Sequence, residues 1–80
     1  MSLGQTIVDR LKEAFPDVRL KLEDTGGGNH WDLTIASDGL KDLNRVKQHQ
    51  AVYKPLKDLI DSNALHALKI TVVPLENWAD

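Results

Sequence analysis

The chain has 80 residues, of which 41% are hydrophobic and 28% charged, and its formal net charge is −2 at pH 7. These values fit one small globular domain, exclude a disordered chain and disfavour a strongly basic nucleic-acid module. The absence of cysteine excludes disulfides, thiol nucleophiles and an iron–sulfur site built from the chain's own thiolates. No membrane-spanning run or signal-peptide pattern occurs, so we expect a cytoplasmic protein that binds no membrane.

The first helix is predicted from the spacing of apolar residues between Thr6 and Phe15. These side chains recur at intervals of three and four residues, which places them on one helical face. Pro16 follows, and because the residue before a proline is biased away from helical geometry, the helix is expected to end there. Residues 1–4 are expected to be a disordered or vector-derived extension of a single domain that spans 1–80.

Two alternating segments then predict a pair of strands. Apolar and polar residues alternate over 18–23 and again over 31–36, with the period of a half-buried strand. The connecting segment 24–29 holds three consecutive glycines, which resist both helix and strand, so it is expected to form a loop. Such a short connection favours an antiparallel hairpin.

A second helix is predicted over 45–61, with Asn44 as its N-cap after an irregular segment at 37–44. Its apolar residues again follow helical spacing. Pro55 lies within this helix and deletes one backbone donor, so we expect a bend or a separate turn at that point.

A third strand is predicted over 66–73, and residues 75–78 are expected to form a last helical turn. Because a helix precedes it, this strand can run parallel to either of the first two. Each strand has one apolar face, so both helices are expected on the same side of the sheet. The fold class is therefore α+β, a two-layer sandwich in which a three-stranded mixed sheet follows the order helix, strand, strand, helix, strand.

Basic side chains are concentrated in residues 41–57. This segment contains five Lys or Arg residues and one Asp, so its local charge is +4. This basic patch could contact phosphate groups, an acidic partner or only solvent, and the sequence leaves these three alternatives open. Tyr53 is its one aromatic residue, so a base-stacking platform is not indicated. The side chains expected to contact a partner or nucleic acid are Arg45, Lys47, His49, Lys54 and Lys57.

Three histidines are the candidate metal ligands in a chain without cysteine. His30 follows the glycine loop, His66 opens the third strand, and His49 lies on the second helix, where solvent exposure is the simplest expectation. If the third strand runs parallel to the second, His30 and His66 begin strands at the same end of the sheet and approach one another. The two are then either metal ligands or polar residues at strand ends.

Motifs for catalysis are weak in this sequence. The Asp-Thr-Gly tripeptide at 24–26 matches aspartic proteases, but the chain lacks the hydrophobic approach strand and β-rich pattern that this chemistry needs. The glycines at 26–28 are not followed by Lys and Ser or Thr, so they do not form a phosphate-binding loop. No Ser–His–Asp or metalloprotease spacing occurs, and we expect a protein that is not an enzyme.

Several motifs of the second half are distinctive in combination. They are Val-Tyr-x-x-Leu at 52–56, His-Ala-Leu at 66–68, and a terminal pair formed by Pro74 and Trp78. Together with the order of elements, they make residues 5–78 resemble the BolA family, most closely its IbaG-type branch. The resemblance implies an α+β fold of the class II KH-like type.

The same resemblance implies a partner and a cargo. Family members pair with monothiol glutaredoxins that carry Cys-Gly-Phe-Ser, and a [2Fe–2S] cluster is bridged between the two proteins. His66 corresponds to the family's histidine ligand, and His30 takes the place of a second ligand from the loop between the first two strands. Glutaredoxin cysteine and glutathione would supply the sulfurs, while the isolated chain, a monomer or weak homodimer, would carry no cofactor. Because ligation needs neutral imidazole, assembly is expected to weaken in acid, and the donor set resembles a Rieske centre.

An alternative function also follows from the resemblance. BolA-like proteins are described as transcriptional regulators of cell shape and stress response, so DNA binding through the basic second helix is the alternative. The chain departs from the family pattern at 40–42, where Leu-Lys-Asp replaces Phe-x-Gly, and its terminal Pro-to-Trp spacing is one residue longer than usual. The Gly-x-x-Gly loop of nucleic-acid-binding KH-like domains does not occur.

Overall fold

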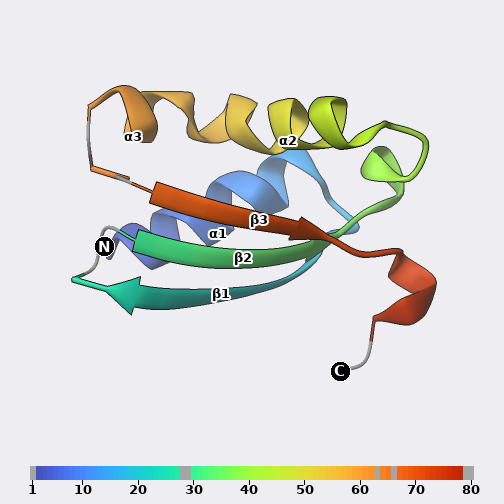
Figure 1. Cartoon of the computed structure of the whole chain (residues 1–80), viewed down its shortest axis with the longest axis horizontal. Helices are drawn as coiled ribbons and strands as arrows, with labels where there is room; N and C mark the ends of the chain where they lie inside the picture. The colour runs from blue at the N-terminus through green and yellow to red at the C-terminus, as the bar shows by residue number, and fades with distance from the viewer. Residues whose placement is uncertain (1, 28–29, 63, 66, 79–80) are drawn as a thin grey trace.

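The structure is a computed structural model that describes residues 2–27, 30–62, 64–65 and 67–78. Figure 1 labels the helices and strands, and short 3₁₀ turns, named η in the text, occur between or after some of them. In chain order the elements are α1 (Leu3–Ala14), β1 (Arg19–Gly26), β2 (His30–Ala36), η1 (Asp38–Leu40), α2 (Arg45–Tyr53), η2 (Lys54–Leu56), α3 (Lys57–Asp61), β3 (Ala67–Val72) and η3 (Leu75–Asn77).

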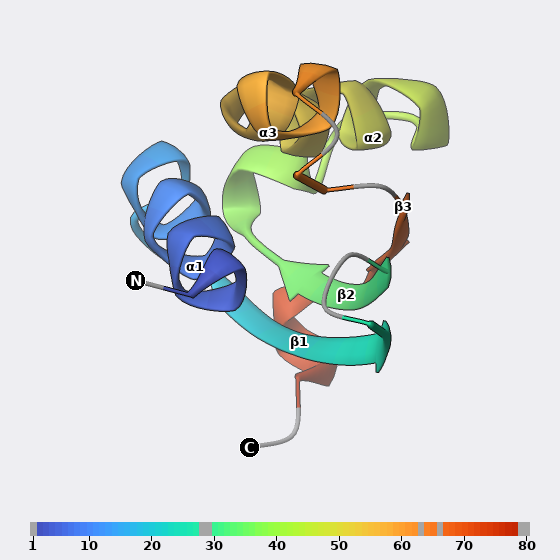
Figure 2. The same cartoon turned by 90° about the vertical axis from the view of Figure 1, so that its left-hand side faces the viewer.

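The three strands form one mixed sheet in the order β1-β2-β3. β1 and β2 pair antiparallel, with Arg19 opposite Ala36, which confirms the predicted hairpin. β2 and β3 pair parallel, with His30 opposite Ala67, so the third strand runs with the second and not with the first. The helices cover one face of the curved sheet (Figure 2), and the predicted two-layer α+β architecture is confirmed.

The core lies between the helices and the sheet. Alternation along β2 turns Leu33 and Ile35 inward, while α1 contributes Ile7 and Leu11 from one face. None of the helices in the described part of the chain is long and apolar enough to cross a membrane. The buried residues of the core are Ile7, Leu11, Leu33, Ile35, Leu40, Val52, Leu56, Leu65 and Ile70.

Two predicted boundaries are wrong at the N-terminal half. α1 begins at Leu3 and not at Thr6, because the Ser2 hydroxyl accepts a hydrogen bond from the Gln5 N–H at 3.2 Å and caps the helix. Of the residues set aside as an extension, 2–4 therefore belong to the cap and first turn of α1.

β1 also continues into the segment that was predicted as a loop, and it ends at Gly26. A bulge between Asp24 and Gly26 allows this, since Gly26 still pairs with His30 across the hairpin. Two local hydrogen bonds hold the bulge: the Gly26 N–H donates to Asp24 Oδ1 at 3.0 Å, and the Thr25 hydroxyl donates to the His30 carbonyl at 3.1 Å. Gly27 has φ of 70°, a conformation that favours glycine.

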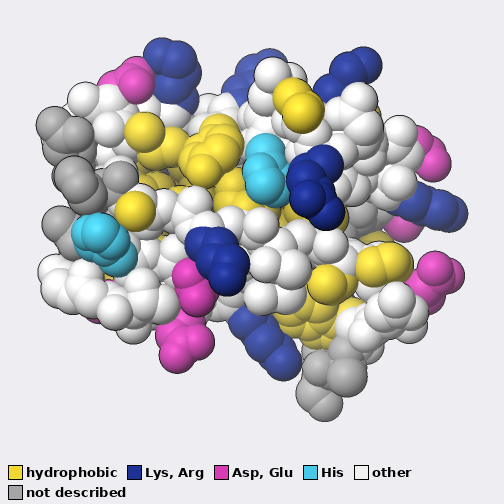
Figure 3. Space-filling view, in the orientation of Figure 1, with side chains coloured by type: hydrophobic (Ala, Val, Ile, Leu, Met, Phe, Trp, Pro, Cys, Tyr) yellow, Lys and Arg dark blue, Asp and Glu magenta, His cyan; other side chains and the backbone are white. Residues whose placement is uncertain are grey.

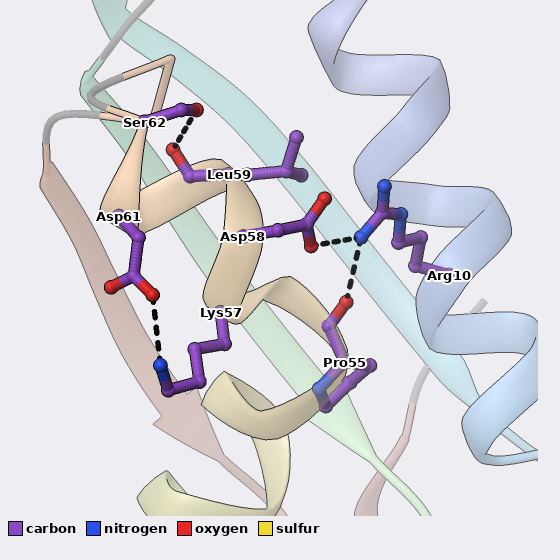
Figure 4. A network of polar contacts seen from close by, with 7 residues as sticks. All are labelled: Arg10, Pro55, Lys57, Asp58, Leu59, Asp61 and Ser62. Atoms are coloured by element: carbon purple, nitrogen blue, oxygen red, sulfur yellow. Dashed lines mark hydrogen bonds and ion pairs between the residues drawn. The ribbon is translucent and has the colours of Figure 1, made fainter.

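The long helix predicted over 45–61 is divided at Pro55, as its missing N–H led us to expect. α2 ends at Tyr53, the 3₁₀ turn η2 follows, and α3 continues from Lys57. Arg10 on α1 donates hydrogen bonds to the Pro55 carbonyl at 3.2 Å and to the Asp58 carboxylate, and so ties α1 to this bend (Figure 4). The same ion pair raises the pKa of Arg10 and lowers that of Asp58.

Asn44 caps α2 as predicted, because its side chain accepts from the Lys47 N–H at 2.9 Å. The predicted C-terminal turn is present as η3, and Trp78 follows it. The Lys21 ammonium of β1 lies 5.5 Å from the centre of the Trp78 ring, within range of a cation–π contact. The end of the described chain is thus fastened to β1.

A closed polar cluster holds together the end of the sheet at which β1 begins and β2 finishes. The Ser37 hydroxyl donates to Asp17 Oδ1 at 2.6 Å, and the Asp38 N–H donates to Asp17 Oδ2 at 2.8 Å. These two bonds, led by that of Ser37, lower the pKa of Asp17. Ser37 is buried, and its hydroxyl also accepts from the Gly39 N–H at 3.2 Å, so this hydroxyl is bonded both as donor and as acceptor within the turn.

Candidate functional site

His30 begins the central strand at the other end of the sheet, and its side chain is exposed. The bulge of β1 and the Thr25 hydrogen bond to its carbonyl fix its backbone. Its register partner on β3 is Ala67. The second predicted ligand, His66, lies outside the described residues, so the structure describes one of the two predicted ligands and, for the other, the residue that follows it in the sequence.

The parallel pairing of β2 and β3 decides which residues meet at this end. Because both strands start here, the segment that enters β3 through Leu65 and Ala67 lies beside the start of β2. Residue 66 is joined by one peptide bond to Ala67, which is paired with His30. Had β3 run in the direction of β1, its first residue, Ala67, would lie at the opposite end of the sheet from His30.

The metal donors predicted from the sequence are histidine imidazoles. The chain contains no cysteine, and the described residues include no group of three or more His, Cys, Asp or Glu side chains placed to hold a metal ion. Imidazole nitrogen suits zinc, copper, iron and nickel. Four ligands are needed for a [2Fe–2S] cluster, so two histidines could complete one only together with donors from another molecule.

A cleft of about 800 Å³ opens beside the entrance to β3, between this strand and the helices α2 and α3. Hydrophobic side chains gather along it (Figure 3). Tyr53 spans the cleft, because its hydroxyl donates to the Leu68 carbonyl of β3 at 3.1 Å. The lining residues are Gln50, Tyr53, Lys54, Lys57, Ile60, Asp61, Leu65, Ala67 and Leu68.

The predicted basic residues do not form one uniform patch. Arg45, Lys47 and Lys54 are exposed, and none of them has an ion pair within the described residues. Lys57 is exposed but contacts Asp61, with 2.8 Å between Nζ and Oδ2, and this contact raises the pKa of Lys57 (Figure 4). Three of these basic side chains, on α2 and η2, thus have no ion pair with any described residue, and the charge of the fourth, Lys57, is partly neutralised.

His49 is not the fully solvated residue that its sequence neighbours suggested. It is half-buried and lines a smaller hollow of about 280 Å³ together with Arg45 of α2 and residues Ile70 to Val72 of β3. The position follows from the packing of α2 along β3, which the helical pattern alone does not reveal. The cleft itself was also missed, although the Val-Tyr-x-x-Leu motif at 52–56 contains the tyrosine that spans it.

A mixed three-stranded sheet covered by helices on one face, with an exposed histidine at the start of its central strand, defines a small two-layer α+β domain. The family model described as "BolA-like protein" matches residues 7–76, and the chain therefore belongs to the BolA family. This confirms the resemblance seen in the sequence.

Individual relatives agree with this assignment. The "Acid stress protein IbaG" of Escherichia coli is 33% identical over 55 residues, which cover 69% of this chain and 66% of the relative. The "DNA-binding transcriptional regulator BolA" of Haemophilus influenzae is 26% identical over 86 aligned positions, which cover 98% of this chain and 82% of the relative. Among solved structures, the BolA domain of SufE1 from Arabidopsis thaliana superposes with a TM-score of 0.84 at 30% identity, and the match covers 98% of each chain.

Proposed function

We propose that this protein is a non-enzymatic adaptor that joins a monothiol glutaredoxin and, with it, binds or transfers a [2Fe–2S] cluster as cargo. The observation that carries the proposal is the β2–β3 register, which pairs exposed His30 with the residue that follows His66. Membership of the BolA family supports it as well, since the family resemblance implies this partnership.

The residues of this chain suit one half of such a centre. His30 lies at a strand end, where its backbone is fixed by the Thr25 hydrogen bond and its side chain is accessible to a partner. The chain has no cysteine, so the thiolates belong to the glutaredoxin and to glutathione. Replacement of thiolate by imidazole raises the reduction potential of a [2Fe–2S] centre, and a mixed centre of this kind would accept electrons more readily than an all-thiolate one.

Each part of the chain then has a distinct task. His30 and His66 donate imidazole nitrogen, and each must be neutral to do so. The buried core behind β2 holds the strand end in place while the partner docks. The cleft between α2, α3 and β3 opens at the same end, where a partner that reaches His66 would meet it.

Anaerobic reconstitution tests the proposal. Visible absorbance and circular dichroism would be recorded for a monothiol glutaredoxin with iron, sulfide and glutathione, with and without this protein. We expect a changed spectrum with the wild type and with His49→Ala, which removes a histidine outside the proposed centre. The change should be lost with His66→Ala and reduced with His30→Ala.

Two results bear directly against the adaptor function. A glutaredoxin spectrum that is the same with and without the wild-type protein would overturn it. An equal response of all three histidine variants would refute the assignment of ligands. Far-ultraviolet circular dichroism and thermal unfolding of each variant would separate loss of a ligand from loss of the fold.

DNA binding is a second candidate, favoured by the exposed and unpaired Arg45, Lys47 and Lys54 among the described residues and by the name of the Haemophilus relative. Phosphate contacts release counterions, so affinity for a DNA duplex should fall steeply with salt. Lys47→Ala and Lys54→Ala should each reduce the slope of log K against log salt by about 0.9. An affinity that does not respond to salt would exclude this candidate.

A further inference from the structure

The outer edge of β3 carries main-chain groups that face away from the sheet. In the described sheet β3 is an edge strand, paired on one side with β2. The Val73 N–H donates to the Ile35 carbonyl of β2, so the odd-numbered residues of this segment turn toward β2. Leu68, Ile70 and Val72 therefore present their N–H and C=O groups to the other side, where Tyr53 already donates to the Leu68 carbonyl.

This edge lies along a groove. The 800 Å³ cleft flanks the first half of β3, and the 280 Å³ hollow flanks the second half, so together the two follow the strand beside α2. The first part has an apolar wall formed by Tyr53, Ile60 and Leu65. An unpaired strand edge next to an apolar wall is the arrangement by which extended peptides add to a sheet.

The charge along the groove selects an acidic occupant. Lys54 lines the apolar cleft and Arg45 lines the hollow, and neither has an ion pair within the described residues. Asp61 also lines the cleft, but Lys57 neutralises it. The protein as a whole is acidic, with a net charge of −2, so these cations are a local feature of the groove and not a consequence of overall charge.

We propose that β3 is a docking edge for an extended, acidic segment of a partner protein, which adds beside it as a fourth strand. The main chain of the segment bonds to Ile70 and Val72, beyond the carbonyl that Tyr53 occupies. Alternate apolar side chains enter the cleft, and alternate carboxylates contact Arg45 and Lys54. The docking needs no cluster and no metal, so it goes beyond the proposed adaptor function and stands or falls separately.

A peptide fits the groove better than a single nucleic-acid strand does. Bases need stacking platforms, and among the described residues that line the two hollows the aromatic rings are the phenol of Tyr53 and the half-buried imidazole of His49, one in each hollow. The Tyr53 hydroxyl is held by Leu68, and only 36% of the residue is exposed. The apolar wall suits aliphatic side chains, and the outward main-chain groups suit a polypeptide backbone.

Fluorescence anisotropy with the metal-free protein provides the test. The probe is a fluorescein-labelled nonapeptide in which glutamate and leucine alternate. A second probe is the same peptide N-methylated at alternate positions, which removes the N–H groups of one edge. A third probe is a nine-nucleotide oligothymidine, which represents nucleic acid. We expect the first peptide to bind, the N-methylated peptide to bind at least about tenfold more weakly, and oligothymidine not to compete.

Matched variants locate the binding. Arg45→Glu and Lys54→Glu, each made singly, should weaken binding of the first peptide by about threefold. Lys47→Glu is the control, because Lys47 belongs to the same helix and, in the described chain, lines neither hollow. Amide chemical shifts in nitrogen–proton correlation spectra should move most at 68–72.

Three outcomes would overturn the docking edge. Equal affinity for the N-methylated peptide would exclude strand addition. An equal loss with Lys47→Glu would show diffuse charge attraction in place of a groove. Tighter binding of oligothymidine, with displacement of the peptide, would assign the surface to nucleic acid. A folded spectrum of each variant keeps these outcomes separate from unfolding, and none of them bears on cluster binding.

Discussion

The two ends of the sheet are built in opposite ways. At the end where β2 finishes, the hydroxyl of buried Ser37 and the N–H of Asp38 both donate to Asp17, and the turn is closed by its own hydrogen bonds. At the end where β2 and β3 start, exposed His30 lies opposite Ala67 and a cleft opens beside the entrance to β3. At the first end a buried hydroxyl bonds within the turn, whereas at the second end an exposed histidine lies near an open cleft.

This contrast separates stability from function in a domain of 80 residues. A chain of this size buries a small core and has a small free energy of unfolding, so an exposed strand end such as that of His30 depends on a well-fixed scaffold. The closed end and the core under β2 provide that scaffold. Substitutions at the closed end should therefore lower the stability of the fold, whereas substitutions at the His30 end should impair the proposed cluster binding.

The largest expected effect comes from the core of the shared central strand. Ile35 is fully buried near the closed end of β2, and Ile35→Ala should cost about 3 kcal/mol in the free energy of unfolding, because it leaves a cavity. Urea unfolding followed by circular dichroism measures it. His30→Ala, at the exposed end of the same strand, should keep near wild-type stability. An equal decrease in the free energy of unfolding for both variants would contradict the contrast between the two ends.

Removal of the buried hydroxyl at the closed end should have the next largest effect. Ser37→Ala deletes a hydrogen bond to the Asp17 carboxylate and the cap of Gly39, and should cost about 2 kcal/mol. Cluster formation with glutaredoxin should survive under conditions where the variant is folded. A variant that remains fully stable would show that this turn contributes nothing to the scaffold.

The closed end should also confer acid sensitivity. The pKa of Asp17 is lowered by hydrogen bonds from Ser37 and Asp38, so its stabilising contribution is complete above the pKa of the unfolded chain. It disappears as pH falls through the lowered pKa of the folded state. Asp17→Asn should thus be less stable than wild type near neutral pH, and the two should converge in strong acid. Thermal unfolding across pH measures this, and a constant difference would contradict it.

The smallest effect is expected where α1 supports the wall of the groove. Arg10→Met removes a partly buried hydrogen bond to the Pro55 carbonyl and an exposed ion pair with Asp58, and we expect both to contribute modestly. Hydrogen exchange of the amides of α3 should accelerate by roughly threefold, while those of β2 stay unchanged. Uniform acceleration through the whole chain would mean that Arg10 supports the core and not this wall alone.

The elements themselves were predictable because each has a local signal. Alternation gave the strands, helical spacing gave the helices, and Asn44 and Pro55 marked a cap and a break that the structure confirms. The predicted boundaries of helices and strands were wrong where a local side-chain hydrogen bond or a bulge extended the element. Ser2 started α1 earlier than the apolar pattern suggested, and the bulge at Asp24 carried β1 to Gly26 despite the glycines.

The candidate site was only half predictable. The sequence identified His30 as a ligand candidate, but the helix before β3 permitted either parallel pairing, and only the three-dimensional register placed Ala67 beside it. The cleft was not predictable, because it arises between elements that are distant in the sequence: Tyr53 of α2 and Leu68 of β3. His66 stays a prediction, since it lies outside the described residues.

The central claim is that this chain gives imidazole nitrogen to a [2Fe–2S] cluster. Pulsed electron paramagnetic resonance of the reduced complex with unlabelled glutaredoxin and ¹⁵N-histidine-labelled protein tests it most directly. We expect strongly coupled nitrogens whose couplings change to those of ¹⁵N on labelling, with one nitrogen lost in His30→Ala. Nitrogen couplings that are unaffected by labelling of this chain would contradict the account.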